Sequence, residues 1–552
     1  RGGKLQMGPI WDFDRSMSCD HDSRTVNPEV WSLATDANYF FANGGPLWFR
    51  DLASNDPDFW MVWVDRWKLM RDGPLTDAAI TARIERMRTE ISAAADRNYT
   101  KWSGVLQDDE TFDGKVDVMK NHALTRANWI DEQLVDAPRF SSGGGMVSAG
   151  FQLTMTGPET KYVTLDGSDP RASGGSPSGT SYGAPITITE NTLVRARAWN
   201  GHSFVNAPST WPWSAMTEAM FVVDPAPLAI TEIMYHPRPA GGGAESGFSG
   251  SDFEFIEFQN TGVSSCSLIG VRLVDGVEFD FTEGACTSLA GGDYGVVVRN
   301  LDAFKARYPD WTSRNILGTF EGRLSDSTEN VRMGYEAGTL LALADFDYED
   351  DWYPSTDGEG FSLVLRDPQT MPTTWDAKGA WRHSAAVDGS PGTVDPALAY
   401  APGSIVINEV LSNSGGAATG DWIELHNTTG SGINVGGWFL SDSRGSLTKF
   451  TIPAGTMVPG GGFVVLTEAD HFGASFALNK HGDSVFLSAG SGGSLSEPAY
   501  RETVDFGAQD PGVSFGRHVR ADGSTVFTAQ ASATAGEANA GPRVGPLVIT
   551  EI

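Results

Sequence analysis

The chain has 552 residues, a formal charge of −31, 65 glycines and 29 prolines. That length exceeds what a single hydrophobic core supports, so several domains are expected. The acidic balance excludes nucleic acid as a partner, because phosphate binding needs clustered Lys and Arg. It fits a soluble extracellular protein, an acidic saline setting or divalent cation binding, with plain solubility the simplest explanation. No apolar run approaches the roughly 18 residues of a membrane span.

The opening stretch RGGKLQMGPIWDFDRSMSCDHD carries an acidic cluster. If WDFD is a strand, Asp12 and Asp14 point to one side while Trp11 and Phe13 pack into the core. Mg²⁺ typically takes one or two protein carboxylates and fills its other positions with water and phosphate. We therefore predict a magnesium site at Asp12 and Asp14, with either residue as the principal ligand. The following run 20–22 is expected to be an exposed polar loop rather than a source of further ligands.

Residues 1–137 hold the only clearly helical patterns. The stretch 56–73 places apolar residues at helical spacing, namely Trp60, Trp63, Val64, Trp67 and Met70. A second helix is expected after Thr76 or Asp77, either of which can cap its first turn, and a third over 116–135. Because the Trp residues recur on one helix face, a buried stripe is favoured over a ligand platform.

The composition changes sharply after residue 137, where a Gly- and Ser-rich linker begins. Beyond it the chain reads as short strands separated by Gly, Pro, Asn and Asp turns. Residues 146–224 form a first β unit that contains KYVTLDGSDP and LVRARAW. Its Trp199, Trp211 and Trp213 fit core or interdomain packing better than a sugar-binding surface, which fold analogy alone does not establish.

An internal repeat follows this unit. PLAITEIMYHP at 227 recurs as SIVINEVLSNS at 404 and as PLVITEI at 546, and FEFIEFQNTG at 253 recurs as DWIELHNTTG at 421. The motifs keep their order with a period of about 175 residues, which is a domain length and far above the period of a solenoid repeat. The sequence therefore predicts a tandem array of β domains, with a third copy beginning at the last seven residues.

Both repeats carry a pair of glutamates at matching places, Glu232 with Glu257 and Glu409 with Glu424. Paired carboxylates can act as acid and base, but nothing else catalytic accompanies these. Their recurrence in two copies favours a shared structural role as hydrogen-bond acceptors. A metal or ligand site is the next interpretation, and catalysis is the least favoured.

The stretch ADFDYEDDWYPSTDGEG at 344–360 is a dense acidic loop. Ca²⁺ takes about six to eight oxygen ligands, and Asp345, Asp347 and Asp350 are candidates to supply them. The stretch lacks the spacing of an EF-hand loop. Its counterpart in the second repeat keeps only Asp505 and Asp510. A calcium site is therefore predicted in the first repeat at most.

Cysteine is sparse, and no CxxC or Cys/His zinc spacing occurs. Cys266 and Cys286 lie 20 residues apart, at strand-edge or turn positions of one predicted domain. A disulfide between them is a candidate, and by closing a loop it would stabilise the domain by about 3 kcal/mol.

The ordered motifs of the repeat resemble the bacterial lamin-tail domain, over 227–397 and 402–541. That resemblance implies an immunoglobulin-like β-sandwich for each copy. Residues 146–224 resemble the chitobiase C-terminal type of β-sandwich, through YVTLDGSDP, the Ser/Gly-rich turn, Tyr182, the PITI strand and LVRARAW.

Residues 1–137 resemble the C-terminal part of the spore-coat CotH kinase family, through GKLQMGPIWDFD and the terminal helix ending LTRANWIDEQL. The resemblance implies an atypical kinase that moves phosphate from ATP to Ser or Thr with Mg²⁺ or Mn²⁺, with one or both of Asp12 and Asp14 as metal ligands. RSMSCDHD follows the motif without the small turn usual in the family, which puts the local geometry in doubt. No Gly-rich phosphate loop, phosphate-binding Lys or catalytic-loop Asp precedes it. We therefore expect this chain alone to be inactive and an intact parent to be a Ser/Thr kinase.

The predicted fold class is multidomain, with an N-terminal helical segment like the C-lobe of an α+β kinase followed by all-β immunoglobulin-like sandwiches. The predicted domain bounds are 1–137, 138–225, 226–400, 401–541 and, for the start of a third repeat, 542–552. We expect a fragment of a large secreted or cell-surface bacterial protein, whose sandwiches are spacers or binding modules for extracellular or surface proteins or glycans. The alternatives are a non-enzymatic adhesion or matrix protein with a dead kinase-like module, and a glycan-binding protein.

Overall fold

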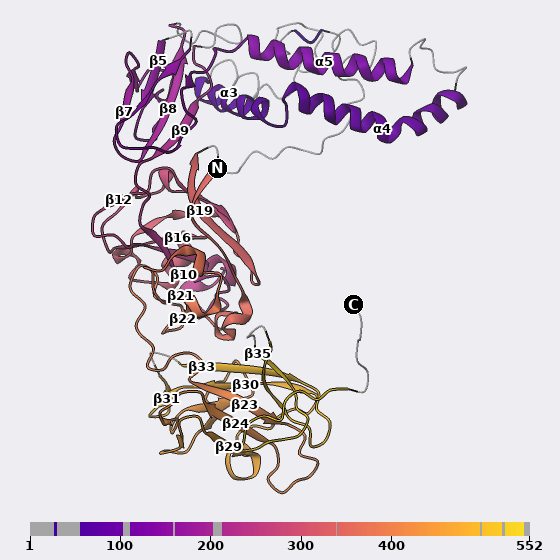
Figure 1. The fold of residues 1–552 in the computed structure, drawn as a ribbon, viewed down its shortest axis with the longest axis vertical. Helices are drawn as coiled ribbons and strands as arrows, with labels where there is room; N and C mark the ends of the chain where they lie inside the picture. Colours follow the sequence, from indigo (N-terminus) through magenta and orange to yellow (C-terminus); the bar gives the residue numbers. More distant parts are fainter. Residues whose placement is uncertain are drawn as a thin grey trace. The chain divides into compact units, whose positions relative to one another are not determined.

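The structure is a computed structural model, and it describes residues 27–29, 56–102, 111–157, 160–201, 212–337, 339–496, 500–521 and 525–545 (Figure 1). Long helices come first, and every described strand lies at or beyond Arg139. The predicted fold class of a helical segment followed by β-sandwich domains is confirmed. The chain divides into two compact units, 1–224 with 337–339, and 225–336 with 340–552. Within the described residues, no helix is long and apolar enough to cross a membrane.

Three long helices precede the first strand in the described chain: α3 (Pro57–Asp72), α4 (Asp77–Lys101) and α5 (Phe112–Glu132). Each begins after a residue whose side chain accepts hydrogen bonds from N–H groups of the first turn, namely Asp56, Thr76 and Thr111. Of the two caps predicted for the second helix, Thr76 is the one used, and its hydroxyl lies 3.1 Å from the amide of Ala79. The three helices predicted from the sequence are confirmed.

Polar side chains tie the helices together. Asp131 of α5 accepts hydrogen bonds from Trp67 Nε1 and Arg71 Nε of α3, each at 2.8 Å. Lys120 of α5 pairs with Glu85 of α4 at 2.7 Å, and Figure 1 draws these two helices alongside each other. No described residue of α4 is fully buried, whereas α3 buries Trp60, Met61 and Val64. Burial in this segment is therefore concentrated on α3, the helix that contacts the strands that follow.

The first β domain belongs to the same compact unit as the helices. Its main sheet has the strand order β2-β9-β8-β5-β6, and β3-β7 and β1-β4 form two smaller pairs. The strands are β1 (Arg139–Phe140), β2 (Gly145–Met146), β3 (Phe151–Leu153), β4 (Met155–Thr156), β5 (Thr160–Thr164), β6 (Thr180–Ser181), β7 (Ile186–Ile188), β8 (Thr192–Trp199) and β9 (Thr217–Val222). Leu153, Val194 and Phe221 pack between the sheets as its core.

Repeat 1, residues 227–397, is built on a six-stranded sheet of order β17-β16-β11-β10-β21-β22 and a five-stranded sheet of order β18-β14-β13-β19-β20, with β12-β15 as a small pair. The strands are β10 (Leu228–Met234), β11 (Phe255–Asn260), β12 (Cys266–Ser267), β13 (Val271–Asp275), β14 (Val277–Asp280), β15 (Ser288–Leu289), β16 (Tyr294–Val298), β17 (Ile316–Thr319), β18 (Glu321–Gly322), β19 (Glu329–Ala337), β20 (Thr339–Tyr348), β21 (Leu363–Leu365) and β22 (Trp381–His383). Helix α6 (Leu301–Arg307) lies between β16 and β17.

Short helical turns occupy several loops of repeat 1. They are η1 (Gly243–Glu245), η2 (Gly250–Phe253), η3 (Phe281–Glu283), η4 (Trp311–Ser313), η5 (Asp350–Trp352), η6 (Pro354–Thr356), η7 (Pro372–Thr374) and η8 (Lys378–Ala380).

Repeat 2, residues 402–541, has sheets of order β29-β24-β23-β34-β35 and β27-β26-β30-β33, with β25-β28 and β31-β32 as small pairs. The strands are β23 (Ile405–Leu411), β24 (Trp422–Asn427), β25 (Ile433–Asn434), β26 (Phe439–Ser441), β27 (Phe450–Thr451), β28 (Met457–Val458), β29 (Phe463–Thr467), β30 (Gly482–Ser488), β31 (Gly490–Ser491), β32 (Ser494–Leu495), β33 (Arg501–Gly507), β34 (Phe515–Val519) and β35 (Thr525–Ala529). The π-helix η9 (Glu468–Phe472) follows β29.

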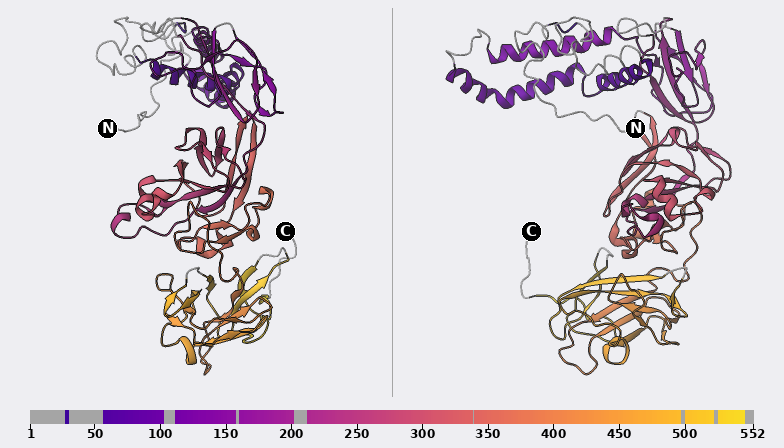
Figure 2. Two further views of the ribbon diagram at one scale, coloured as in Figure 1. Left: turned by 90° about the vertical axis from the view of Figure 1, so that its left-hand side faces the viewer. Right: turned by 180° about the vertical axis from the view of Figure 1, so that it is seen from behind.

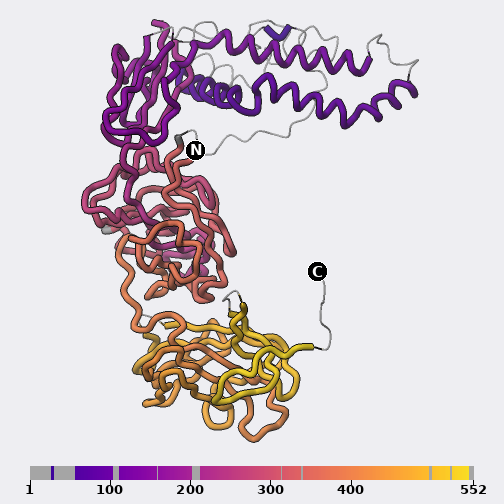
Figure 3. Tube along the Cα trace, in the orientation of Figure 1, coloured from indigo at the N-terminus to yellow at the C-terminus, as the bar shows by residue number. Residues whose placement is uncertain are grey.

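Most strands of the two repeats correspond: β10–β16 match β23–β29, β19 matches β30, and β20–β22 match β33–β35. The strands β17 and β18 of repeat 1 and the pair β31-β32 of repeat 2 have no counterpart. Both repeats are drawn largely as strands in Figure 2, and their chain can be followed as a tube in Figure 3. The match extends to side chains at turns. Asn260 Nδ2 donates to the carbonyls of Ser264 and Leu289, and Asn427 Nδ2 donates to those of Ser431 and Val458. The repeat found in the sequence is therefore a repeat of the fold, and the two asparagines close the same turn in each copy.

Candidate functional site

The predicted magnesium ligands Asp12 and Asp14 lie outside the described residues, as does the run 20–22. The magnesium site at this motif therefore stays a prediction.

The predicted calcium ligands are only partly brought together. Asp345 and Asp347 are alternate residues of β20, so they share a face, and Asn330 Nδ2 of β19 donates to both at 3.1 and 3.0 Å. Asp345 also pairs with Arg332 at 3.2 Å, while Asp350 lies beyond the strand at the start of η5. Across the described ranges, no three His, Cys, Asp or Glu side chains are placed to hold a metal ion. Asn330 and Arg332 thus bind two of the three aspartates predicted for Ca²⁺, Asp345 and Asp347, and the calcium site stays a prediction.

The predicted disulfide is wrong, because Cys266 and Cys286 are free thiols. Cys266 of β12 lies opposite Leu289 of β15, and Cys286 precedes Leu289 by three residues on that side of the pair. Three residues of extended chain span about 10 Å, whereas a disulfide joins Cα atoms less than about 7 Å apart. Cys286 Sγ instead donates to the carbonyl of Ser288 at 2.9 Å.

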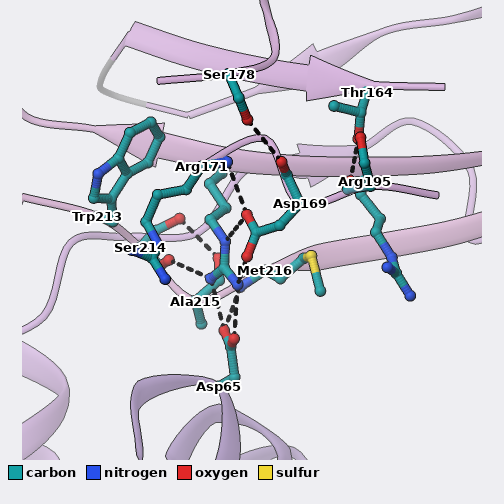
Figure 4. A network of polar contacts seen from close by, with 12 residues as sticks. Asp65, Thr164, Asp169, Arg171, Ser178, Arg195, Trp213, Ser214, Ala215 and Met216 are labelled. Carbon is teal, nitrogen blue, oxygen red and sulfur yellow. Dashed lines mark hydrogen bonds and ion pairs between the residues drawn. The ribbon is translucent and has the colours of Figure 1, made fainter. Parts of the chain in front are cut away.

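The first polar network of note joins α3 to the first β domain around Arg197 of β8, whose side chain is 1% exposed (Figure 4). Asp65 of α3 receives two hydrogen bonds from its guanidinium, at 2.8 and 2.7 Å. Asp169, from the turn after β5, receives two more at 2.8 Å each. The carbonyl of Ser214 accepts a fifth at 3.0 Å. Every N–H group of this guanidinium therefore has a partner, which is the condition for burying the charge.

The charge of Arg197 is fixed by these partners. Burial alone would lower the pKa of its guanidinium, but the hydrogen bonds that it donates to Asp65 and Asp169 raise that pKa above its ordinary value. Asp65 also accepts from the amide of Met216 at 2.9 Å, so one carboxylate of the helix binds both a side chain and a backbone of the β domain.

A second carboxylate of α3 binds at the rim of the same interface. Asp58 accepts from Ser173 Oγ at 2.5 Å, from Arg171 Nη1 at 2.6 Å and from the amide of Gly174 at 3.1 Å. The hydrogen bond from Ser173 and then the Arg171 guanidinium lower the pKa of the Asp58 carboxyl. Asp58 and Asp65 are seven residues apart, about two helical turns, so they present one face of α3 to the β domain.

Aromatic packing fills the space between these carboxylates. Trp60, Met61 and Val64 of α3 form one buried cluster with Trp213 and Ala215. Trp199 is partly buried against the same cluster, while Trp211 lies outside the described residues. Packing rather than an exposed sugar platform is therefore confirmed for Trp199 and Trp213.

The second feature is the glutamate pair of each repeat. Glu232 of β10 lies directly opposite Glu257 of β11, and Glu409 of β23 directly opposite Glu424 of β24. All four side chains are buried, with at most 2% exposed. The register shifts just before the first glutamate in both repeats, between Ile230 and Glu232 and between Ile407 and Glu409. This is a β-bulge, which re-aims a side chain at a chosen point of a ladder.

The bulged residue supplies a donor to the opposite glutamate. Thr231 Oγ1 donates to Glu257 at 2.6 Å, and Asn408 Nδ2 donates to Glu424 at 2.7 Å. A serine hydroxyl donates to the other member of each pair, from Ser362 to Glu232 and from Ser514 to Glu409. The predicted structural role as hydrogen-bond acceptors fits these contacts.

The environment of the pairs favours their protonated forms. Burial raises the pKa of Glu232 and of Glu424 to about 7 each. Burial and the neighbouring Glu232 raise the pKa of Glu257 well above its ordinary value. Two opposed carboxyl groups with no cation between them cannot both ionise cheaply, so each pair is suited to retaining a proton.

Sequence reasoning missed the centre of the helix–strand network. Arg197 sits in the alternating strand LVRARAW, where an arginine reads as solvent-facing, and its partners lie 132 and 28 residues away. The one available signal was the DGSDP turn, but the cation nearest to its Asp169 in sequence is Arg171, and nothing in the turn points to Arg197 as the partner.

Three parts of the chain match family models. Residues 1–130 match the CotH kinase protein, residues 151–207 the family described as Fn3 associated, and residues 399–502 the Lamin Tail Domain. The CotH and lamin-tail resemblances are thereby confirmed for these segments, and repeat 1 shares the strand order of repeat 2 apart from its two extra edge strands, β17 and β18. The β domain matches the Fn3-associated model where a chitobiase type was expected. Together these matches indicate a multidomain bacterial protein.

No curated protein matches the chain. Among solved structures, a DUF4876 family protein from Bacteroides thetaiotaomicron VPI-5482 is 12% identical, with a TM-score of 0.20, covering 48% of this chain and 96% of that one. The S-layer protein rSbsC is 10% identical, with a TM-score of 0.12, covering 83% of this chain and 68% of that one. Scores this low do not bear on the fold.

Proposed function

We propose that this chain is part of a secreted or cell-surface bacterial protein in which a CotH-like kinase module is carried by β-sandwich domains. The observation that carries the proposal is the attachment of α3 to the first β domain through Arg197, Asp65 and Asp169. Helix α3 falls within the segment that matches the CotH kinase protein. Domains that are joined only by a flexible linker share few contacts, so a buried and fully paired arginine at this junction indicates a fixed attachment.

The packing supports a carrier role for the first β domain. Its Trp213 donates from Nε1 to the carbonyl of Gly175 at 2.8 Å and is 1% exposed beneath α3. Burial of such aromatic side chains stabilises an interface by roughly 2–3 kcal/mol each. The interface therefore combines charge pairing with apolar burial, as in a permanent contact rather than a transient one.

Catalysis by the intact protein would depend on residues outside the described ranges. Asp12 and Asp14 are the residues expected to hold Mg²⁺ or Mn²⁺ with ATP, and the metal would neutralise charge on the transferred phosphate. Asp12 and Asp14 lie outside the described residues, so the arrangement of this site is not part of the structure described here. The lamin-tail repeats are proposed to act as spacers and as binding modules for extracellular proteins or glycans.

The kinase hypothesis is tested on the protein as it is isolated from the bacterium that produces it. With Mg²⁺ and ATP, we expect phosphate transfer to Ser or Thr that is lost in Asp12→Asn and Asp14→Asn and kept in the control Asp345→Asn. Mg²⁺ and Mn²⁺ titration by calorimetry gives a second readout for the same variants. No transfer in the wild type, or transfer unchanged in both variants, would leave the adhesion or matrix alternative.

Cell localisation is tested separately. Fractionation of the producing bacterium should place the protein in the medium or on the surface. Recovery in the cytoplasm would contradict the secreted assignment without touching the kinase hypothesis.

A further inference from the structure

We propose that a cavity on the first β domain binds a short neutral oligosaccharide. The cavity has a volume of about 740 Å³ and lies beside the edge strand β6, between the end of β5 with the turn that follows it and the segment 178–186. That volume falls within the range of about 300–1,000 Å³ that is usual for small-molecule sites. The assignment goes beyond the carrier role proposed for this domain, and it does not rest on the kinase hypothesis.

One charged side chain lines the cavity, the exposed carboxylate of Asp166. The hydroxyl and the amide of Ser168 both donate to its Oδ1, at 2.6 and 3.0 Å, and these bonds lower the pKa of the Asp166 carboxyl. Because both bonds end on Oδ1, Oδ2 can accept hydrogen bonds from a ligand. The cation that acts on Asp166, Arg195, is paired with Glu218 and does not line the cavity. Among the described residues no Lys, Arg or His lines it, so an anionic ligand would meet only repulsion.

The other polar side chains of the lining carry hydroxyls. Thr180 and Ser181 of β6 are exposed, and within the described part of the domain their hydroxyls make no hydrogen bond. Each hydroxyl has one donor and two acceptor positions, as each hydroxyl of a sugar has. A neutral ligand with many hydroxyls therefore finds both donors and acceptors here, together with the acceptor Oδ2 of Asp166.

The walls of the cavity are held in place by the network around Arg197. The turn that supplies Asp166 also supplies Asp169, which accepts from Arg197 Nε at 2.8 Å. Ser178, on the opposite wall, donates from Oγ to the carbonyl of Asp169 at 2.9 Å (Figure 4). Thr164 Oγ1 donates to the carbonyl of Ser168 at 2.5 Å. A cavity with walls fixed in this way loses less conformational entropy when a ligand binds.

Apolar side chains form another part of the lining. Leu165 is 48% exposed, while Tyr182 and Ile186 pack against the core of the domain and also line the cavity. The Tyr182 hydroxyl accepts from the amide of Met155 at 3.1 Å, so the ring has a fixed position. A sugar ring presents hydroxyls at its rim and C–H groups on its faces, and it therefore matches a lining that offers both hydroxyls and apolar surface.

The edge of the sheet does not favour an extended peptide as the ligand. Strand β6 is only two residues long, and Pro185 of the same segment has no N–H group to donate. Short edge strands resist pairing with a further strand. Strand addition depends on main-chain hydrogen bonds, of which this edge can form few. The side chains of the lining, rather than its backbone, therefore determine the class of ligand.

Isothermal titration calorimetry on the full chain tests the site. The neutral probes are maltotriose, cellotriose, mannotriose, xylotriose and the trimer of N-acetylglucosamine, and trigalacturonate is the acidic probe. We expect saturable binding of at least one neutral probe and no binding of trigalacturonate. Asp166→Asn should weaken that binding by about tenfold to a hundredfold, because hydrogen bonds to an ionised carboxylate are lost. The control Asp224→Asn neutralises an exposed carboxylate of the same domain outside the cavity and should leave binding unchanged.

Gly183→Trp is a second variant that keeps the test decisive if Asp166→Asn does not fold. A Cβ at Gly183 meets no atom within 4 Å, so the indole can occupy the cavity without a clash at the backbone, and binding should be abolished. Absence of binding by every neutral probe in the wild type overturns the proposal, as does binding that is unchanged in both variants.

The class of ligand is tested in the same titrations. Equal binding of trigalacturonate would overturn the neutral class, and tighter binding of an uncharged peptide of serine and threonine would identify a peptide groove in place of a sugar site. Neither result bears on the attachment of α3 through Arg197, which the unfolding of the full chain measures separately.

Discussion

The α3 interface and the glutamate pairs bury charge in opposite ways. Arg197 is buried as a cation between two carboxylates, and every one of its donors is used. Glu232 and Glu257 are buried as two acids side by side, and their hydrogen-bond partners in the described structure are hydroxyls and amides rather than a cation. The first arrangement holds charge by pairing, whereas burial in the second raises the pKa of Glu232 and so disfavours its ionised form. The difference teaches that the same chain buries a cation by surrounding it with carboxylates, and buries carboxyl groups by surrounding them with neutral donors.

Arg197→Ala is expected to have the largest effect, because it leaves Asp65 and Asp169 facing each other without a counter-ion. Removing one partner of a buried charge pair typically costs about 3–5 kcal/mol. This loss can be measured by denaturant unfolding of the full chain, monitored by Trp fluorescence. The relevant transition is the one to which the tryptophans of α3 contribute.

Arg86→Ala is the matched control for that variant. Arg86 is 69% exposed, and its partner Glu90 lies 3.7 Å away at 64% exposure, so the loss should stay within about 0.5 kcal/mol. A loss in Arg197→Ala no larger than in Arg86→Ala would mean that the buried network does not hold the helix.

The pH dependence should separate the two regions. The raised pKa values of Glu232 and Glu424, about 7 each, give the repeats stability that is full below pH 4.5 and is lost as the pH rises toward 7. The lowered pKa of Asp58 gives the α3 interface stability that is full above pH 3.8 and is lost only in stronger acid. Calorimetry from pH 5 to pH 7 should therefore show the repeats losing stability. The first unit should lose none, because burial lowers the pKa of its His122 and this group adds stability as the pH rises toward 6.5.

One group in repeat 1 opposes this trend. Burial lowers the pKa of His383 to about 4, so its contribution grows as the pH rises from 4 to 6.5. In Glu232→Gln, the increase in stability with pH that His383 causes should remain, and part of the decrease with pH that the glutamates cause should disappear. A repeat 1 that becomes steadily more stable from pH 5 to pH 7 in the wild type would contradict the comparison.

Two glycines whose amides donate to the glutamate pairs test how far the pairs depend on backbone donors. The amide of Gly392 donates to Glu257, and that of Gly536 donates to Glu424. Gly392→Ala and Gly536→Ala both place a side chain in a left-handed conformation, at about 1–2 kcal/mol each. A Cβ at Gly392 would also lie 2.9 Å from Arg314 Cβ, whereas nothing lies within 4 Å at Gly536. Thermal unfolding should therefore show a larger loss for Gly392→Ala than for Gly536→Ala, and equal losses would argue that the backbone at residue 392 can shift freely.

Asp58→Asn should have the smallest effect. The Asp58 side chain is 41% exposed and pairs with Arg171 at the rim of the interface, where solvent screens the charge. We expect a loss below about 1 kcal/mol in the same denaturant assay. A loss as large as that of Arg197→Ala would show that the rim, and not the buried centre, holds α3.

Much of the architecture was readable from local patterns. The Trp60–Met70 spacing and the Thr76 cap gave the helices, and the repeated ITEI and INEV motifs gave two equivalent β domains. The repeat also placed Glu232 and Glu257 at positions matching Glu409 and Glu424, and it favoured a structural role for them. Such features can be predicted because helix and strand periods appear within short stretches of sequence, and because a duplicated domain repeats the same short motifs.

Other features depend on how distant segments meet. The spacing of Cys266 and Cys286 in the sequence suggested a disulfide. In the structure, however, the register of β12 against β15 places Cys266 opposite Leu289 and not opposite Cys286. The aspartates of 344–360 suggested calcium, but Asn330 of the neighbouring strand binds two of them.

The sequence by itself determined the order of the domains, the helices and the equivalence of the two repeats. The tertiary structure alone decided that Arg197 joins α3 to the first β domain, and that each glutamate pair accepts hydrogen bonds from backbone amides more than a hundred residues away. The physical reason is that a buried charge is tolerated only where partners converge on it. Those partners come from turns, bulges and chain ends whose mutual positions no local pattern encodes.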